Sequence, residues 1–383
     1  MAPHQNPNWE IEYRRELSRL VTFIPNKNVP IHNWFYFKEG FSRDFVLYVL
    51  NVFKVARRDV VLDPFCGVGT TLLSCKELGI SSVGVDALPL MVFISSVKTR
   101  DYDLPKLKSD YEFLFRGGLE EPKSSNVKNF VKQFFKPSVL KEVLSFKEKI
   151  MNIKDENSRG LFLLALMSAA VKASYMYKDG AVLKVVKKPV PPFRKFFKRR
   201  CRIMLRDLEL ANLPRGIDTR VLLGDARKLD HLDDSSVDFV ITSPPYLNKI
   251  EYTKAYTVEQ ELFLGGEKPE LVRSCIGLEV RDLMSDKYSS LPPIARAYFL
   301  DMERAIGEMY RVVRKGGLLA VVVAGGVFPT EIVDSDLIIS GIAEEAGFRV
   351  KSITAVNYRT AAHGKFVKLG SSRESIIFLE KPN

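Results

Sequence analysis

Cysteine and histidine are both scarce in this sequence. The four cysteines, Cys66, Cys75, Cys201 and Cys275, are widely separated, form no C-x-x-C pair and share the chain with only four histidines. Zinc sites and disulfide frameworks need such residues in close, regular spacings. The sequence therefore predicts neither a metal site nor a disulfide scaffold.

Long apolar runs are also missing. The opening segment, residues 1–20, lacks the apolar core that a secretory signal requires. The apolar stretch LFLLALMSAAV ends after 11 residues, whereas a membrane-spanning helix needs about 20. We therefore expect a soluble cytoplasmic protein that does not span a membrane.

Acidic residues are outnumbered by basic ones. Lysine and arginine total 58 against 46 aspartates and glutamates, a formal net charge of +12. This balance favours a polyanionic partner, most simply nucleic acid, and an anionic membrane surface fits it as well. Glutamine is rare, with three in a chain that is 27% charged, which leans towards a thermophilic source.

Strand and helix patterns alternate at both ends of the chain. Residues 59–80, DVVLDPFCGVGTTLLSCKELGI, predict a strand, a glycine turn and a helix capped by Thr70, and residues 81–99 repeat the scheme with a strand ending at Asp86. Later strands end at Asp225 and Ser243, and a pair of strands closes the chain. This alternation predicts an α/β fold, with a mostly parallel sheet and helices on both faces.

The segment between Asp86 and Asp225 is far longer than one crossover helix requires. Apolar residues recur there at helical spacing in residues 138–153 and 158–177. We therefore divide the chain into residues 1–100, the N-terminal segment and first half of the α/β domain; residues 101–215, a helical insertion; and residues 216–383, the second half of the α/β domain.

Residues 181–206, within this insertion, carry ten basic residues and no acidic one. A charge run usually marks a solvated helix face, but this run has one sign and is interleaved with Phe193, Phe196 and Phe197. We predict nucleic-acid contact because neutralising phosphates requires such surfaces. The predicted contacts are Lys187, Lys188, Arg194, Lys195, Lys198, Arg199, Arg200 and Arg202.

Glycines and acids recur where the predicted strands end. Gly67 and Gly69 lie in the first strand-to-helix turn, where a backbone without Cβ atoms can approach a ligand closely. Leu72 replaces the third glycine of the dinucleotide fingerprint. Asp86 could accept from two ribose hydroxyls and Asp225 from an adenine amino group. Each aspartate alone is better explained as a cap or turn residue; in this order they predict an adenosyl ligand without a pyrophosphate.

Two motifs together carry a family resemblance. DPFCGVGTT, residues 63–71, followed by TSPPY, residues 242–246, resembles the amino-methyltransferases that use S-adenosylmethionine (SAM) to methylate exocyclic nitrogens of nucleobases. Ser-Pro-Pro-Tyr alone could be an ordinary turn. The match spans roughly residues 30–100 and 218–383 and leaves the insertion unmatched. The resemblance implies a Rossmann-like sheet of seven strands, the last of them antiparallel. It also implies that the α/β domain binds SAM.

The resemblance also implies which residues bind SAM. Upstream, residues 32–50 resemble the family's N-terminal SAM-contacting segment, and an aromatic core strand explains them equally well. The glycine turn would hold the methionine part, and the two strand-end acids the ribose and the adenine. The predicted cofactor-binding residues are Asp63, Phe65, Cys66, Gly67, Gly69, Thr70, Thr71, Asp86, Ala87, Asp225 and Ala226.

By the same resemblance, the target base lies at Ser243, Pro244, Pro245 and Tyr246, the predicted catalytic residues. An aromatic amine is a poor nucleophile because its lone pair is delocalised into the ring. Ser243 Oγ and the Pro244 carbonyl oxygen can accept its hydrogens and localise that lone pair, on a backbone that two prolines hold rigid. Tyr246 would stack on the base. This chemistry needs no metal.

The nature of the substrate is less sharply defined. A serine before the two prolines resembles the enzymes that act on the N4 amino group of cytosine. The compact basic insertion suits folded RNA, whose single-stranded bases can enter a pocket, and the chain resembles archaeal ribosomal RNA cytidine methyltransferases. We therefore expect N4 methylation of cytidine in RNA, with ribosomal RNA as the partner. The alternatives are a DNA N4-cytosine or N6-adenine modification methyltransferase and a non-catalytic RNA-binding ribosome-assembly factor.

Overall fold

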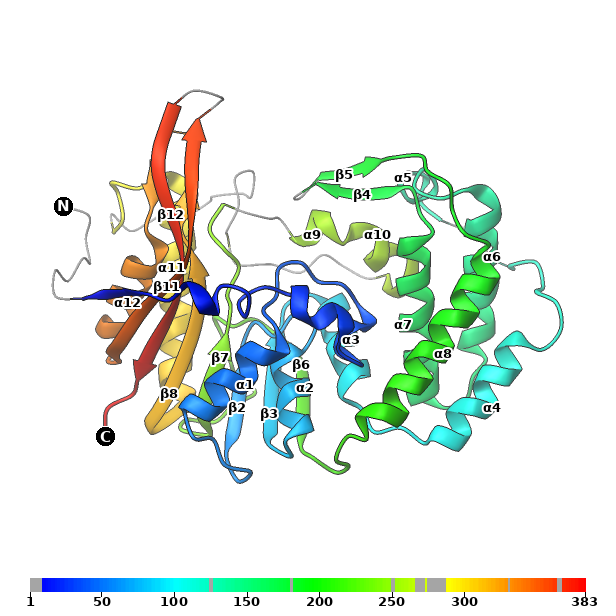
Figure 1. Cartoon of the computed structure of the whole chain (residues 1–383), viewed down its shortest axis with the longest axis horizontal. Coiled ribbons are helices and arrows are strands. Elements are labelled where there is room, and N and C mark those ends of the chain that lie inside the picture. The colour runs from blue at the N-terminus through cyan, green and yellow to red at the C-terminus, as the bar shows by residue number, and fades with distance from the viewer. Residues whose placement is uncertain are drawn as a thin grey trace.

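A sheet of eight strands forms one half of the protein, on the left in Figure 1. The computed structural model describes residues 9–123, 127–179, 182–248, 252–265, 273, 287–329, 331–363 and 367–383. In spatial order the strands are β1 (Ile11–Tyr13), β11 (Arg349–His363), β12 (Val367–Glu380), β8 (Val313–Ala324), β7 (Val237–Thr242), β2 (Val60–Asp63), β3 (Ser81–Asp86) and β6 (Thr219–Leu223). The five strands from β8 to β6 run parallel, and β12 is antiparallel to both of its neighbours.

The predicted α/β fold is confirmed, with one strand added. The last strand, β12, is antiparallel as expected. The count of seven strands needs correction, because β1 pairs in parallel with β11 and extends the sheet to eight among the described residues. Three residues are too few for an alternating pattern to appear in a sequence, so β1 was not predicted.

Helices cover both faces of the sheet. Successive residues of a strand point to opposite faces, so Val61 and Ile241 pack on one side with α1 (Arg43–Val52), and Leu62 and Val240 on the other with α11 (Pro293–Val312). Both sides are apolar and buried, as parallel sheets require. The other helices around the sheet are α2 (Thr70–Glu77), α3 (Pro89–Thr99) and α12 (Ser335–Glu345).

A helical unit lies beyond the edge strand β6 (Figure 1). Its apolar residues form one core with the N-terminal segment and α3, in which Leu164 of the unit joins Trp34 and Ile94. Its elements are α4 (Leu104–Phe115), α5 (Asn129–Lys132), α6 (Pro137–Met151), α7 (Glu156–Lys172), the hairpin β4 (Met176–Asp179) with β5 (Val182–Val185), and α8 (Phe193–Ala211).

The chain enters and leaves this unit at one point. The Gly216 backbone N–H donates to Asp101 at 3.0 Å, and Arg215 Nη2 donates to the Tyr102 carbonyl oxygen at 3.2 Å. Lys76 of α2 also donates to Asp101, at 2.6 Å. The division of the chain at residues 101 and 215 stays a prediction, and these contacts lie at its two boundaries.

Short elements complete the fold. Residues 32–50 form η3 and α1, so an aromatic strand there is wrong: Ser42 caps α1 by accepting from the Phe45 N–H at 3.1 Å, and buried residues recur at helical spacing behind it. The remaining elements are η1 (Arg15–Leu17), η2 (Ile24–Asn28), η3 (His32–Trp34), α9 (Tyr252–Ala255), α10 (Thr257–Glu259), the π-helix η4 (Gln260–Leu264), β9 (Gly326–Val327) and β10 (Ile332–Val333).

Candidate active site

The carboxyl ends of four neighbouring strands bring the predicted site residues together. Strand β2 ends at Asp63 and β3 at Asp86, while β6 leads to Asp225 and β7 leads directly into Ser243. These strands are adjacent and parallel, in the order β7-β2-β3-β6. Open α/β sheets bind their ligands at this edge. The predicted cofactor and catalytic residues therefore line one edge of the sheet.

Asp63 links the glycine turn to the catalytic loop. One carboxylate oxygen accepts from Thr242 Oγ1 at 2.7 Å and from the Phe65 N–H at 3.2 Å, and the other accepts from Thr71 Oγ1 at 2.7 Å. Burial raises the pKa of Asp63 to about 6, although the three hydrogen-bond donors each lower the pKa. Because its hydrogen bonds are made within the protein, Asp63 fixes β2, α2 and the end of β7 relative to one another.

The glycine turn, residues 63–71, has left-handed backbone at both predicted glycines. The φ angles are 49° at Gly67 and 77° at Gly69. A Cβ atom at Gly69 would collide with the Ser95 side chain, and one at Gly67 would lie 3.1 Å from the Phe37 ring. Both positions therefore require glycine. Gly69 itself is the N-cap of α2, so the predicted Thr70 cap is wrong: Thr70 is already the first helical residue.

Asp86 lies beside the glycine turn. Its carboxylate accepts from the backbone N–H groups of Gly67 and Leu88, each at 2.9 Å. Burial raises the pKa of Asp86 to about 6, although the hydrogen bonds from the two backbone amides lower the pKa. Each carboxylate oxygen has two acceptor sites, so Asp86 can still accept from the two hydroxyls of a ribose. Ala87 follows it and is half-buried.

We expect SAM to bind more weakly as the pH falls below 6. With its pKa at about 6 in the free protein, Asp86 is ionised at pH 8 and mostly protonated at pH 5, and an ionised carboxylate accepts hydrogen bonds more strongly. Calorimetry should give a Kd for SAM that rises by up to about fivefold between pH 6 and 5, because the ionised fraction of Asp86 falls from about one half to about one tenth. Asp86→Asn should bind SAM weakly at every pH. If this variant kept the wild-type pH dependence, the titrating group would be Asp63 instead.

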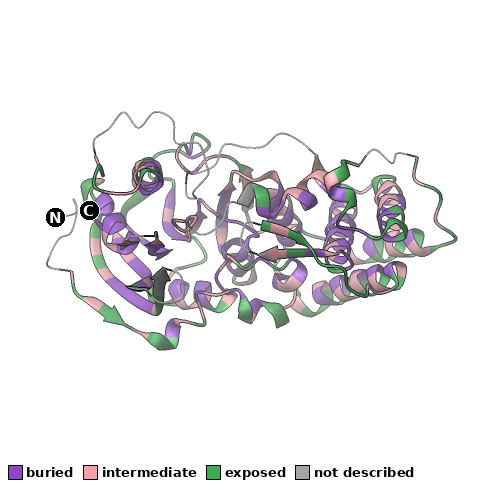
Figure 2. Ribbon diagram, turned by 90° about the horizontal axis from the view of Figure 1, so that it is seen from above, coloured by how far each residue is buried: buried purple, intermediate pink, exposed green. Residues whose placement is uncertain are grey.

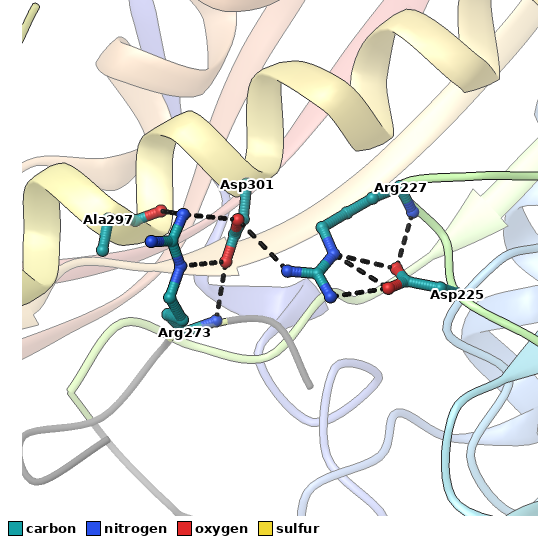
Figure 3. Close-up of polar contacts among 5 residues, drawn as sticks. All are labelled: Asp225, Arg227, Arg273, Ala297 and Asp301. Carbon is teal, nitrogen blue, oxygen red and sulfur yellow. Dashed lines mark hydrogen bonds and ion pairs between the residues drawn. The ribbon is translucent and has the colours of Figure 1, made fainter. Parts of the chain in front are cut away.

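An arginine holds the predicted adenine-side acid (Figure 3). Arg227 Nη2 donates to Asp225 at 2.6 Å, and its Nε lies 2.9 and 3.0 Å from the two carboxylate oxygens. Asp225 is 33% exposed, whereas Ala226 is buried. An adenine amino group would therefore share the Asp225 carboxylate with Arg227.

The same arginine reaches a second acid, Asp301 of α11 (Figure 3). Arg227 Nη1 lies 3.2 Å from Asp301, which is fully buried, and Arg273 donates to Asp301 from Nε and Nη2 at 2.9 and 2.8 Å. Burial raises the pKa of Asp301, but the two arginines outweigh it and hold the pKa below its usual value. The row Asp225-Arg227-Asp301-Arg273 thus connects the adenine side of the site to α11.

The catalytic loop, Ser243 to Tyr246, is bonded to strands beyond β7. Ser243 Oγ donates its proton to the Val322 carbonyl oxygen of β8 at 3.2 Å. The oxygen's lone pairs remain to accept, as the predicted chemistry requires. The Tyr246 hydroxyl donates to Glu374 of β12 at 3.0 Å, and buried Glu374 also accepts from Asn357 at 2.8 Å. Pro244 is buried and Pro245 half-buried.

Several residues of this site were missed in the sequence. Thr242 is the first residue of the recognised motif but was assigned no role, and Arg227 follows the recognised acid by two positions. Asp301 follows the apolar residues 297–300 and precedes Met302, a signal that could have found it, because a buried charge needs a partner. Glu374, between Arg373 and Ser375, gives no such signal. Which partner each acid has depends on long-range packing that the sequence pattern does not reveal.

The predicted nucleic-acid contacts fall into two groups. Arg194 Nη2 donates to the carbonyl oxygens of Phe115 and Gly117, and Arg200 Nη2 to those of Asn33 and Trp34 at 2.9 and 2.7 Å. These two guanidiniums join segments of the protein rather than projecting from it. The other six side chains are exposed: Lys187, Lys188, Lys195, Lys198, Arg199 and Arg202.

The phenylalanines interleaved with this basic run do not share its exposed surface. Phe193 and Phe197 are buried in the core of the helical unit, and Phe196 packs against that core. An α-helix has 3.6 residues per turn, so Phe193, Phe197 and Cys201 share the inner face of α8 while the basic residues occupy the outer face. Residues that alternate in the sequence are therefore separated in space.

Arg200→Ala should lower the free energy of unfolding by about 2 kcal/mol, because two hydrogen bonds from a charged donor are lost. Arg199→Ala, one position along the same helix and exposed, should change it by less than about 0.5 kcal/mol. Urea unfolding of the two variants measures the difference. Equal effects would mean that the bonds from Arg200 to Asn33 and Trp34 do not contribute to stability.

The described residues show no metal-binding group and no membrane-spanning helix. Their His, Cys, Asp and Glu side chains form no group of three or more that could hold a metal ion. No helix in the described part of the chain is long and apolar enough to cross a membrane. Cys66, Cys75 and Cys201 are buried free thiols, and Cys275 lies outside the described residues.

Comparison with known proteins gives consistent matches. A family model described as DNA methylase matches residues 40–92, which include α1, the glycine turn and β3. The Type II methyltransferase M.BsoBI of Geobacillus stearothermophilus is 25% identical over 95% of this chain and 88% of its own. The Type II methyltransferase M.AvaI of a Nostoc strain is 25% identical over 90% of this chain and 84% of its own.

Among solved structures, a SAM-dependent methyltransferase from Methanosarcina mazei is 10% identical over 87% of this chain and 97% of its own, with a TM-score of 0.34. The fold assignment therefore rests on the strand order and directions described above.

Proposed function

We propose that this chain is a SAM-dependent amino-methyltransferase of nucleic acids and that it methylates an exocyclic amino group in DNA. The family model that matches it is described as DNA methylase, and three relatives that align with at least 90% of the chain are Type II methyltransferases. These matches favour a DNA substrate, which the sequence left as an alternative, over the RNA substrate that it favoured.

One structural observation supports the proposal most directly: a single carboxylate joins the two halves of the site. Asp63 accepts from Thr71 in the cofactor turn and from Thr242 at the start of the catalytic loop, each at 2.7 Å. A methyl donor over the turn and a base at the loop would therefore be held at adjacent positions on one rigid frame. Such positioning is the main requirement of a direct transfer.

SAM is the cofactor of this protein, and the residues at the sheet edge fit it. Asp86 keeps acceptor capacity beside the turn, and the left-handed backbone at Gly67 and Gly69 carries no Cβ atoms. Asp86 would hold the ribose, and Asp225 with buried Ala226 the adenine. When bound, SAM supplies an electrophilic methyl group.

The chain's own residues would prepare the amine. Ser243 Oγ, whose proton is given to Val322, would accept from one amino hydrogen, and the Pro244 carbonyl oxygen from the other. These acceptors localise the nitrogen lone pair without moving, because two prolines and the bond to β8 fix the loop. Tyr246, held through its hydroxyl by Glu374, would stack on the base.

We propose the N4 amino group of cytosine as the target, because serine precedes the two prolines, with N6 of adenine as the alternative. The test is to incubate the purified protein with isotope-labelled SAM and either unmodified plasmid DNA or ribosomal RNA, followed by nucleoside mass spectrometry. Labelled N4-methylcytosine in DNA is the expected result. Labelled N6-methyladenine would overturn the choice of base, and label in RNA alone would overturn the DNA proposal.

A further inference from the structure

The hairpin of β4 and β5 lies apart from the main sheet, above α9 at the catalytic edge (Figure 1). Seen from above, it lies uppermost between the sheet and the helical unit, and much of it is exposed (Figure 2). Tyr177 pairs with Lys184 and Lys178 with Leu183. A two-stranded ribbon is barely stable alone, so contacts with the rest of the protein must hold it.

The inner face of the hairpin is fixed by Lys178. Its Nζ donates to Glu259 of α10 at 2.6 Å and lies 3.6 Å from the centre of the Tyr256 ring. Glu259 is buried, and losing one partner of a buried ion pair is costly because an uncompensated charge remains. The pair therefore holds the hairpin in one orientation.

The anchor of the hairpin lies next to the site. Tyr256 belongs to the segment that follows the catalytic loop, and its ring centre is 5.8 Å from that of Phe37. Phe37 in turn packs against the backbone of Gly67 in the cofactor turn. Two aromatic rings thus connect the hairpin to the turn, and the ribbon stands at the edge where a target base would enter.

The outer face of the hairpin carries exposed apolar side chains together with one lysine, Lys184. Cross-strand partners in an antiparallel pair point to the same face of the ribbon. Tyr177, Val182 and Lys184 therefore point to the face away from Lys178. The Val186 N–H donates to the Tyr175 carbonyl oxygen at 2.7 Å, and this pairing places Val186 on the same face as Tyr177. Tyr177 is 55%, Val182 58% and Val186 47% exposed. Isolated exposed apolar residues are common, but a cluster of them marks an interaction surface.

Charge indicates what this surface binds. Exposed Lys187 and Lys188 lie just after β5, and α8, the next element of the chain, carries further exposed basic residues. The major groove of DNA admits a two-stranded β-ribbon, where apolar side chains contact thymine methyl groups and neighbouring lysines neutralise phosphates. An apolar ribbon bordered by lysines, beside a base-modifying site, matches this arrangement.

We propose that the β4–β5 hairpin enters the major groove of the substrate duplex and contributes to its sequence preference. Tyr177, Val182 and Val186 would contact base edges, and Lys187 and Lys188 would contact phosphates. This inference rests on the proposed DNA substrate. It differs from the sequence prediction, which assigned nucleic-acid contact mainly to the residues of α8.

The test compares two hairpin variants with a control. Tyr177→Ala/Val182→Thr removes two groove contacts and keeps a β-branched residue in the strand. Lys187→Gln/Lys188→Gln removes two charges. Phe113→Ala, on α4 of the same unit and 44% exposed, is the matched control for loss of an exposed ring. Plasmid DNA of known sequence is the probe, with methylated positions mapped by sequencing, and SAM affinity and Tm are measured in parallel.

The groove variant should raise the KM for DNA by about tenfold and weaken the preference among sequences, with SAM affinity and Tm unchanged. The lysine variant should reduce the slope of log affinity against log salt by about 2, close to 0.9 for each phosphate contact. The control should match the wild type. Folded hairpin variants with wild-type KM, preference and salt slope would overturn the inference; a wild-type protein that transfers no methyl group to DNA would overturn the proposed function itself.

Discussion

Ser243→Ala should lower the rate of methyl transfer about 100-fold, the loss expected for one preorganised hydrogen-bond partner, while SAM affinity stays unchanged. The physical reason is the direction of the serine hydroxyl, whose proton goes to the Val322 carbonyl oxygen at 3.2 Å. The oxygen therefore offers lone pairs rather than a proton to the amine. Removing it leaves one amino hydrogen without an acceptor and the nitrogen lone pair more delocalised.

Single-turnover methylation, measured beside thermal melts, distinguishes this role from a structural one. Loss of the bond to Val322 costs about 1 kcal/mol, too little to unfold the protein and explain a 100-fold loss of rate. Ser236→Ala is the matched control, because its hydroxyl also donates to a backbone carbonyl, that of Asp233 at 2.6 Å, ahead of β7. A folded Ser243→Ala protein that transfers methyl at the wild-type rate would remove Ser243 from the mechanism.

Asp301→Asn should lower the free energy of unfolding by about 3–5 kcal/mol, the typical loss when one partner of a buried charge pair is removed. Asp301 is fully buried between Arg227 and Arg273. The amide keeps the shape of the side chain but not its charge, so two guanidiniums lose their shared counter-ion. SAM binding should weaken as well, because Arg227 also holds Asp225.

Asp234→Asn provides the comparison for this variant. Asp234 pairs with Arg311 at 2.8 Å but is 76% exposed, and an exposed ion pair contributes at most about 1 kcal/mol. The loss of unfolding free energy, measured by urea unfolding, should therefore be several-fold larger for Asp301→Asn than for Asp234→Asn. A loss below about 1 kcal/mol for Asp301→Asn would show that the row of charges near the adenine side does not stabilise the fold.

The sheet and its cofactor edge were predictable because their signals are local. A β-branched strand, a glycine turn and a helix follow one another within residues 59–80, and the family resemblance supplied the antiparallel last strand and SAM. The motif at Ser243 was equally visible. The roles assigned to individual residues remain predictions, now with the geometry in which to test them.

The remaining features depend on distances that the sequence does not contain. Asp301 and Arg227 are paired although 74 positions separate them, and no local pattern predicts that pair. For α8 the sequence does contain the signal. Phe193 and Phe197 are four positions apart, so helical periodicity places them on one buried face, whereas the basic run was considered only in sequence order. The choice of RNA over DNA relied on the overall basicity of the insertion, and charge alone does not distinguish the two polyanions.

We expect the two faces of the β4–β5 hairpin to tolerate substitution differently. Lys178 on the inner face has a buried partner, so replacing it would disturb the segment behind the catalytic loop. Tyr177, Val182 and Val186 on the outer face belong to none of the three apolar cores. Substitutions there leave folding intact and alter only what the ribbon touches. A lineage carrying this hairpin can therefore diverge in the sequences it modifies while its catalytic edge stays the same.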